Sequence, residues 1–410
     1  MKVLSMILAG FVVGYAISDI RPSYSLLSRT AEFGSYWAIV NGLTVVALAA
    51  CAAAVALARV SARAVLVVAI AAVLVIVFYT VGMVTGVLGQ WVVAVGAGAL
   101  LGAAAVLAGL DRGAQSSLAV AVLGAGLLGG ALDAMVQKND GPVFVWDVVG
   151  AEDDVRPQRA IVMVIVASVA AIALFLAHRN QVLQPHEPRK ILLVGLPLPI
   201  AAGVLSWVAA GHEARSVEWL GALAGMTVLA VLAAFVLPRR DGRLLLALVA
   251  VSAAALGSFG FAAGDGAQLA LSVGLLIVGA GIGHRWPQLY IGLGGLLVIA
   301  VASGIEGYSD LPTGSKFALP LVAAYVLVSV LATSPGSLAL SLPALFMMTL
   351  PVSVFSASYE PSLSMNESVI SRTSEPDHLV LSVAGLVVVA VVTVACAVLM
   401  RRPAVVSGTS

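Results

Sequence analysis

The chain has 410 residues, of which 61% are hydrophobic and 10% are charged, and its formal net charge is +1. Its mean hydropathy of +1.09 excludes an ordinary soluble domain. We expect no nucleic-acid partner and no cofactor. The composition predicts an all-α polytopic membrane protein whose first partner is the lipid bilayer.

Charged residues stand in short clusters between apolar runs of about the 20 residues that a helix needs to cross a bilayer. In the sequence TSPGS, Pro335 and Gly336 predict a turn rather than one long helix. We therefore expect about fourteen transmembrane helices, near residues 3–19, 37–58, 64–88, 91–110, 115–136, 159–178, 191–210, 217–237, 244–263, 267–283, 288–305, 316–334, 337–357 and 378–400.

Alternate loops between these spans differ in charge. One set carries +10 and the other −9, which sum to the net charge of the chain. By the positive-inside rule, the basic set is cytoplasmic and both termini lie on that side. The composition, rich in arginine and poor in lysine, points to a bacterial protein of the plasma (inner) membrane. The cations of the basic set are Lys2, Arg59, Arg63, Arg112, Arg179, Arg189, Lys190, Arg239, Arg240, Arg243, Arg285, Arg401 and Arg402.

The first span resembles a secretory signal, but no clear small-x-small cleavage site follows it, so we expect it to be retained. Cys51 and Cys396 fall inside predicted helices, where cysteines usually act as small packing residues.

Two short segments share one arginine pattern. LARVSAR (57–63) and LPRRDGR (237–243) have the frame Leu-x-Arg-x-x-x-Arg. Each follows the second span of a block of six, which predicts two six-helix bundles related by a parallel repeat, as in transporters. The expected division is a first bundle at 1–178, a cytoplasmic linker at 179–190, a second bundle at 191–335, and two further helices with a cytoplasmic tail at 336–410.

These segments resemble the cytoplasmic loop between the second and third helices of the major facilitator superfamily, whose pattern is Gly-x-Leu-Ala-Asp-Arg-x-Gly-Arg-Arg. LPRRDGR supplies Leu237, Arg240, Gly242 and Arg243 in register, and both segments have arginine where the family has aspartate. The family's aspartate caps a neighbouring helix and helps to lock one conformation. AGLLGG (125–130) is similar to the Gly-Pro-x-x-Gly-Gly of the family's exporters, without the proline. Asp19 stands where drug exporters of the family often carry an aspartate. The fourth span lacks the arginine that many antiporters of the family place there.

The resemblance implies that the paired turns form a cytoplasmic gate, in which the arginines contact acidic or carbonyl groups of the opposite bundle. The alternative is that these arginines only fix the topology, as positive charges at cytoplasmic turns usually do. The residues of the expected gate are Arg59, Arg63, Arg239, Arg240 and Arg243.

No ionisable residue falls near the centre of an expected span, where its insertion would cost ~2.5–3.5 kcal/mol. Such a pathway suits an apolar or amphiphilic substrate. The polar residues nearest to it lie toward the outer ends of helices, and acids there favour a neutral or cationic headgroup. The alternative is that these acids are only interfacial. The expected pathway residues are Asp19, Asn41, Asp133 and Glu218.

Clustered glycines indicate closely packed membrane helices rather than nucleotide loops, and we expect Gly126, Gly129 and Gly130 to serve such packing. His178 and His186 in the linker lack a ligand framework, so we expect solvated loop histidines and no metal site. The acidic run at Glu152 to Asp154 is best interpreted as a solvated turn.

Three classes of function follow. The first is a secondary active transporter, an exporter of a hydrophobic or amphiphilic compound by alternating access, and not an enzyme. The second is a non-transporting scaffold subunit of a cell-envelope complex, with a membrane-protein partner. The third is a membrane enzyme with an outward acidic site, and only the acidic run 152–154 supports it. A central cavity between two bundles would favour the first class, and a solid core would favour the second.

Overall fold

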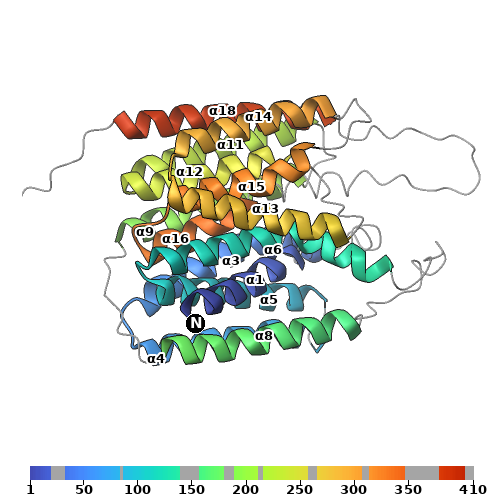
Figure 1. Ribbon diagram of the computed structural model, residues 1–410, viewed down its shortest axis with the longest axis vertical. Helices are drawn as coiled ribbons and strands as arrows, with labels where there is room; N and C mark the ends of the chain where they lie inside the picture. Colours follow the sequence, from blue (N-terminus) through green and yellow to red (C-terminus); the bar gives the residue numbers. More distant parts are fainter. Residues whose placement is uncertain are drawn as a thin grey trace, which may run out of the picture.

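The computed structural model describes residues 1–19, 33–83, 86–138, 157–179, 189–210, 216–256, 266–306, 314–346 and 378–401. Within these ranges the regular structure is entirely helical, and the helices lie side by side in one elongated array (Figure 1). Each expected span has a helix at its place. The expectation of an all-α polytopic membrane protein is therefore confirmed.

The first six expected spans correspond to single helices. These are α1 (Lys2–Asp19), α3 (Phe33–Leu57), α4 (Ala62–Thr80), α5 (Gly86–Ala108), α6 (Arg112–Lys138) and α8 (Pro157–His178). Their apolar sequences supply the long hydrophobic runs that lipid requires. Ser61 caps the start of α4 by accepting a hydrogen bond from the backbone N–H of Ala64 at 3.4 Å.

Two helix pairs dominate the packing of this first group, α3 with α5 and α1 with α6. Both pairs approach closely because one helix presents glycines. A Cβ on Gly102 of α5 would lie 2.5 Å from the carbonyl oxygen of Ala50, and a Cβ on Gly14 of α1 would lie 2.5 Å from that of Val122. Such contacts leave no room for a side chain, as is usual where membrane helices pack backbone to backbone.

The rest of the chain contains shorter and broken helices. They are α9 (Arg189–Gly195), α10 (Pro197–Ala210), α11 (Ser216–Val236), α12 (Arg239–Ala254), α13 (Gly266–Arg285), α14 (Leu289–Glu306), α15 (Gly314–Ser329), α16 (Pro335–Ser341), the 3-10 helix η2 (Leu342–Phe346) and α18 (His378–Arg401). The expected span 191–210 is thus divided into α9 and α10. The expected span 337–357 begins as α16 followed by η2.

A second group repeats the packing of the first. Helix α13 packs along α15 as α3 packs along α5, with Gly283 so close that a Cβ there would lie 2.6 Å from the carbonyl oxygen of Tyr325. Helix α14 contacts α15 and α18, and α12 contacts α18, α16 and η2. The hydroxyl of Tyr325 lies 3.0 Å from the carbonyl oxygens of Trp286 and Gln288 and fixes the turn between α13 and α14.

This packing leads us to a division of the chain that differs from the expected one. Helix α18, expected as part of a C-terminal appendage, packs between α12 and α14, so we propose that the second group consists of α12 to α16, η2 and α18. The additional helices are then α9–α10 and α11, which lie between the two groups in sequence. The segment 237–243 joins α11 to α12. In the proposed division, the turn equivalent to 57–63 is the one between α13 and α14, and the shared arginine frame is then not a sign of structural equivalence.

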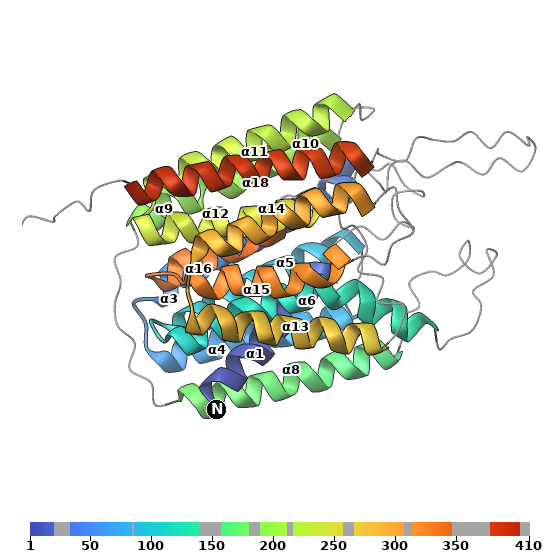
Figure 2. The ribbon, with the colours of Figure 1, turned by 45° about the horizontal axis from the view of Figure 1, so that its top comes forward.

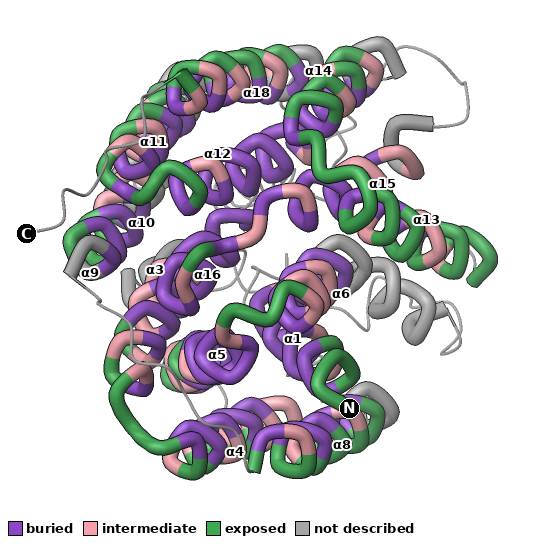
Figure 3. Tube along the Cα trace, turned by 60° about the vertical axis from the view of Figure 1, so that its left-hand side comes forward, coloured by how far each residue is buried: buried purple, intermediate pink, exposed green. Residues whose placement is uncertain are grey.

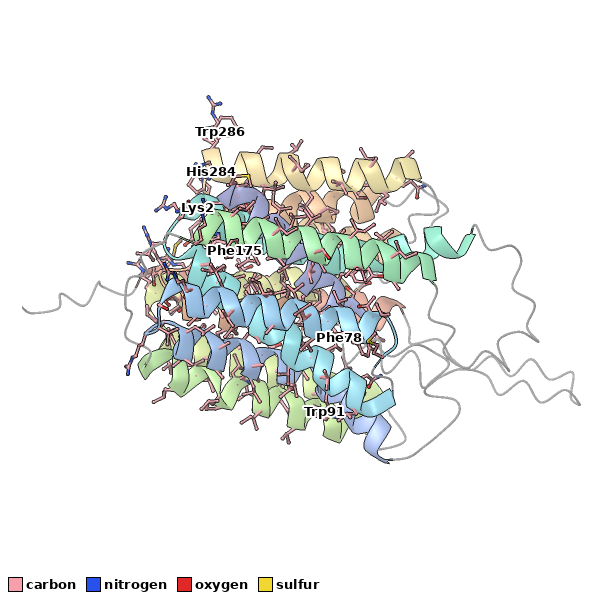
Figure 4. The ribbon with its side chains drawn as sticks, turned by 90° about the horizontal axis from the view of Figure 1, so that it is seen from below. Lys2, Phe78, Trp91, Phe175, His284 and Trp286 are labelled. Carbon is pink, nitrogen blue, oxygen red and sulfur yellow. The ribbon has the colours of Figure 1, made fainter. Side chains whose placement is uncertain are left out.

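One end of the array, which we call the basic end, carries the start of α1 and the end of α18, and it faces the viewer in Figure 3. Nitrogen-bearing side chains gather there, near the labelled Lys2 and His284, whereas Phe78 and Trp91 lie toward the other end (Figure 4). The described cations of this end are Lys2, Arg59, Arg63, Arg112, Arg179, Arg239, Arg240, Arg243, Arg285 and Arg401.

The outer helices expose apolar side chains along their length. Examples are Val67 and Leu74 on α4, Ile165 on α8, Ile277 on α13 and Val394 on α18. Of the described helices, α4, α5, α8, α13 and α18 are long and apolar enough to cross a membrane by length and composition. The exposed apolar surface, costly in water, is suited to lipid.

Candidate functional site

A cavity lies where α3 of the first group, the additional helix α10 and the α16–η2 segment of the second group meet, at the middle depth of the array. It has a volume of about 40 Å³ and is lined by residues of α3, α10 and the junction of α16 with η2. Thr44 and Ala47 of α3 face Pro199 and Ala202 of α10 and Pro343 and Ala344 of η2 across it. A cavity of this size holds one or a few waters. Anything larger requires the surrounding helices to move apart.

Two of the three helical walls of this cavity are discontinuous. Between α9 and α10, Gly195 is followed by a turn at Leu196 and by Pro197. The helix α16 changes to the 3-10 form at Leu342, next to Pro343. Proline has no N–H to donate to the preceding turn, which accounts locally for both breaks. In membrane proteins, interrupted helices at middle depth often line substrate sites, because broken backbone is tolerated only where protein or a cavity surrounds it.

Few polar groups are close to this cavity. The hydroxyl of Thr44 donates to the carbonyl oxygen of Pro199 at 3.3 Å and so links α3 to α10. Thr44 is the polar side chain among the described residues that line the cavity. The remaining lining side chains are leucine, alanine and proline. The arrangement suits an apolar molecule that makes about one hydrogen bond to a side chain.

At the basic end, Asp241 ties α12 to the turn that precedes α16. Its carboxylate is 1% exposed. One oxygen accepts from the backbone N–H of Thr333 at 2.7 Å, and the other accepts from the hydroxyls of Thr333 and Ser337, each at 2.8 Å. Ser334 caps α16 by accepting from the N–H of Ser337 at 3.2 Å. These bonds fix the start of the helix that also contacts α3 and α5 of the first group.

The arginines of the expected gate do not make such contacts. Arg59, Arg63, Arg239 and Arg240 are exposed, and Arg243 is half-buried. Over the described ranges of the chain, no ion pair or hydrogen bond joins these guanidinium groups to the opposite group of helices. The residue that sequence reasoning missed is Asp241, which stands two positions after the arginine that replaces the family's aspartate. Its signal was a lone acid inside a run of arginines.

The predicted glycine Gly126 lies at a contact between the groups. A Cβ on Gly126 would overlap the ring of Phe346, which reaches from η2 to α6. Nearby, a Cβ on Gly124 would lie 3.2 Å from Leu276 of α13. The surroundings of Gly129 and Gly130 lie outside what the structure describes, so their packing role stays a prediction.

The expected pathway residues Asp19, Asn41, Asp133 and Glu218 stand on described helices, but their side chains lie outside the described residues. Asp19 ends α1 and Asp133 is near the end of α6, and these two helices pack together. Glu218 is on α11, which packs on α10, α12 and α18 and lies in another part of the array (Figures 2 and 3). The helices therefore bring Asp19 and Asp133 to one region but do not bring Glu218 there.

The expectation of a solvated His178 is wrong. This residue ends α8, its side chain is fully buried, and its Nε2 lies 3.2 Å from the hydroxyl of Ser5 on α1. The expected span 159–178 already ended at this residue, but the sequence did not show that the last turn of α8 packs against α1 and buries the ring. His186 lies outside the described residues. Among the residues whose placement is described, no group of three potential metal ligands occurs.

No protein-family model matches this sequence, and no curated protein matches it. Several solved structures are similar to this chain along almost its whole length. The peptide transporter PepTSo of the POT family aligns with 98% of this chain and 99% of its own, at 12% identity and a TM-score of 0.53. The human organic anion transporter MFSD10 (TETRAN) aligns with 96% of this chain and 98% of its own, at 13% identity and a TM-score of 0.53. The xylose transporter XylE from E. coli, in a partially occluded inward-open conformation, covers 95% of both chains at 13% identity and a TM-score of 0.52.

Proposed function

We propose that this chain, which has the multi-pass helical fold of major facilitator transporters, is a secondary transporter of a hydrophobic or amphiphilic compound that works by alternating access. The observation that carries the proposal is the cavity where α3 of the first group, α10 and the α16–η2 segment of the second group meet, at a place where two wall helices are broken. The likeness of Ala125–Gly130 and of Asp19 to exporter motifs supports movement outward.

Contacts of the first group with α9, α16 and η2 favour a state closed at the basic end. Gly195 of α9 faces the sulfur of Cys51 on α3, so that a Cβ there would lie 3.0 Å from it, and α16 packs on both α3 and α5. The contact of Gly126 with Phe346 adds a third point deeper in the array. Opening toward the basic end would require these contacts to separate together, as rigid-body motion of one group against the other would achieve.

The chemistry of the interior favours an apolar or amphiphilic substrate. The described helices carry no lysine, arginine, aspartate, glutamate or histidine in their middle turns. The hydroxyls of Thr80 and Thr227 donate to carbonyl oxygens of their own helices, those of Ile76 and Leu223, which leaves them less free for a ligand. A strongly polar solute would meet few partners there and would lose its hydration energy.

A scaffold without transport is the second candidate. The small volume of the cavity, about 40 Å³, and its largely apolar lining favour it, because a tightly packed centre suits a structural subunit. A transporter should move a substrate, and filling its cavity should lower that rate. A scaffold should show no transport to lower.

Filling the cavity is expected to reduce transport. Ala47→Phe and Ala344→Phe each place a ring where the walls of α3 and η2 meet. The purified protein is reconstituted in liposomes, and the movement of dansyl-tailed amphiphiles with cationic, neutral or anionic heads is followed. We expect at least about a tenfold loss for the heads that the wild type carries, since misplacing groups in a binding site commonly costs that much.

Val67→Phe is the matched control, because Val67 is exposed on the lipid side of α4. It should transport like the wild type. A wild type that moves none of the probes faster than protein-free liposomes supports the scaffold. Unchanged rates in both cavity variants would remove this cavity from the pathway.

We also propose that the basic end is cytoplasmic and that the protein lies in the plasma (inner) membrane. Val60, in the turn between α3 and α4 at the basic end, and Met83, after α4 at the opposite end, are both exposed. In intact cells an impermeant maleimide should label Met83→Cys and should label Val60→Cys only after the membrane is opened. The native Cys51 and Cys396 are buried, so the background should be low. The reverse pattern would invert the proposed orientation.

A further inference from the structure

The start of α12 concentrates positive charge for which the described residues provide no ion-pair partner. Arg239, Arg240 and Arg243 fall within the first five residues of this helix. Asp241, the acid among them, already accepts three hydrogen bonds from Thr333 and Ser337. Among the described residues, no carboxylate forms an ion pair with the three guanidinium groups. Their mutual repulsion therefore remains in the folded protein.

Arg243 carries the clearest sign of a missing partner. Its Nε is buried and has no hydrogen-bond partner in the described part of the chain. A buried donor left without an acceptor destabilises a fold, and more so when the group is charged. The side chain lies within electrostatic range of Tyr290 on α14 and Cys396 on α18. An acceptor for this guanidinium group would thus sit where α12, α14 and α18 meet.

The surface beside this junction is apolar. Tyr290 is 50% exposed, and Ile291 and Val298 on α14 and Val394 and Val398 on α18 are exposed as well. The helices α14 and α18 pack together and both pack on α12, and the three lie next to one another in Figure 3. Positive charge thus stands at the end of a two-helix apolar face, at the depth where a lipid headgroup would meet it.

We propose that this junction binds an anionic phospholipid. Its phosphate accepts hydrogen bonds from Arg239, Arg240 and Arg243, with the hydroxyl of Tyr290 as a further donor, and its acyl chains lie along the exposed faces of α14 and α18. Guanidinium groups suit phosphate because they offer several donors in one plane. Basic pockets between membrane helices on the cytoplasmic side commonly hold such headgroups.

The test uses the purified full-length protein in detergent and native mass spectrometry, with phosphatidylglycerol and phosphatidylcholine of identical acyl chains as probes. The wild type should bind phosphatidylglycerol more tightly. Each single alanine variant should weaken that preference about fivefold, the equivalent of ~1 kcal/mol per charge near a headgroup. The three variants are Arg239→Ala, Arg240→Ala and Arg243→Ala. Arg243→Lys should restore part of it.

The matched control is the double variant Arg59→Ala, Arg63→Ala, which removes two exposed cations from another turn of the same end. It should keep the wild-type preference, and all variants should keep the wild-type elution volume on gel filtration. An equal loss in the control would show a general effect of surface charge and overturn the site. Displacement of phosphatidylglycerol by inorganic phosphate at equal concentration would identify a free-anion site and overturn the lipid proposal.

Discussion

Asp241→Ala is expected to lower the thermal stability of the protein strongly and to weaken its closure at the basic end. The substitution leaves the N–H and hydroxyl of Thr333 and the hydroxyl of Ser337 without their acceptor. Hydrogen bonds to a charged group contribute about 1.5–3 kcal/mol each, and their losses do not add fully. We expect a destabilisation of about 3 kcal/mol or more, measured as a lower melting temperature in detergent.

The matched control is Asp111→Ala at the same end. Asp111 is exposed and caps α6 by accepting from the N–H groups of Gly113 and Ala114, at 2.9 and 3.4 Å. Loss of such a cap costs ~1 kcal/mol. In a second set of samples, labelling of a cysteine at the buried position Leu338 of α16 (Leu338→Cys) should rise in the Asp241→Ala background. Equal melting temperatures for the two aspartate variants would show that Asp241 does not hold the turn.

The double variant Gly98→Ala, Gly102→Ala is expected to prevent the accumulation of folded protein. A Cβ on Gly102 would lie 2.5 Å from the carbonyl oxygen of Ala50 and 2.7 Å from the Cβ of Ala53, and Gly98 is equally close to α3. Rotation of a side chain cannot relieve contact with backbone, so α3 and α5 must move apart. Overpacking in a dense interior costs about 1–3 kcal/mol for each site, occasionally more.

The control makes the same change where there is space. Gly274 on α13 and Gly294 on α14 have nothing within 4 Å of the position that a Cβ would take. Alanine there should leave the yield and the melting temperature near those of the wild type, because alanine is the better helix former. If the two double variants express and melt alike, the close packing of α3 with α5 is not required for folding.

The spans could be predicted from the sequence because lipid sets their length and character. Apolar runs of about 20 residues between charged turns located every described helix, and Pro335 and Gly336 marked the break that the structure places just before Pro335. The grouping could not be predicted in the same way. Arginines such as Arg63 and Arg243 mark the end of a helix but carry no information about its neighbours. The glycines of α13 did indicate that this helix packs closely against another. Their spacing alone could not show that the partner is α15.

The candidate site was harder to predict than the fold. Its walls are leucine, alanine and proline, the same residues that fill the rest of the membrane interior, so the cavity has no signature in the composition. Pro343 and the pair Pro197 and Pro199 were the available signals, since proline interrupts helices. Asp241 was counted among the charges of the basic face, and its role became visible only once the turn at Thr333 was placed beside it.

The helices α9–α10 and α11 have a consequence for how the chain is built. They leave the basic end and return to it, as a hairpin of two passes. An even number of passes preserves polarity, so α12 enters the membrane from the same side as α1. Removal of residues 189–236 would therefore leave the orientation of the second group in the bilayer unchanged, although it would also remove the α10 wall of the cavity.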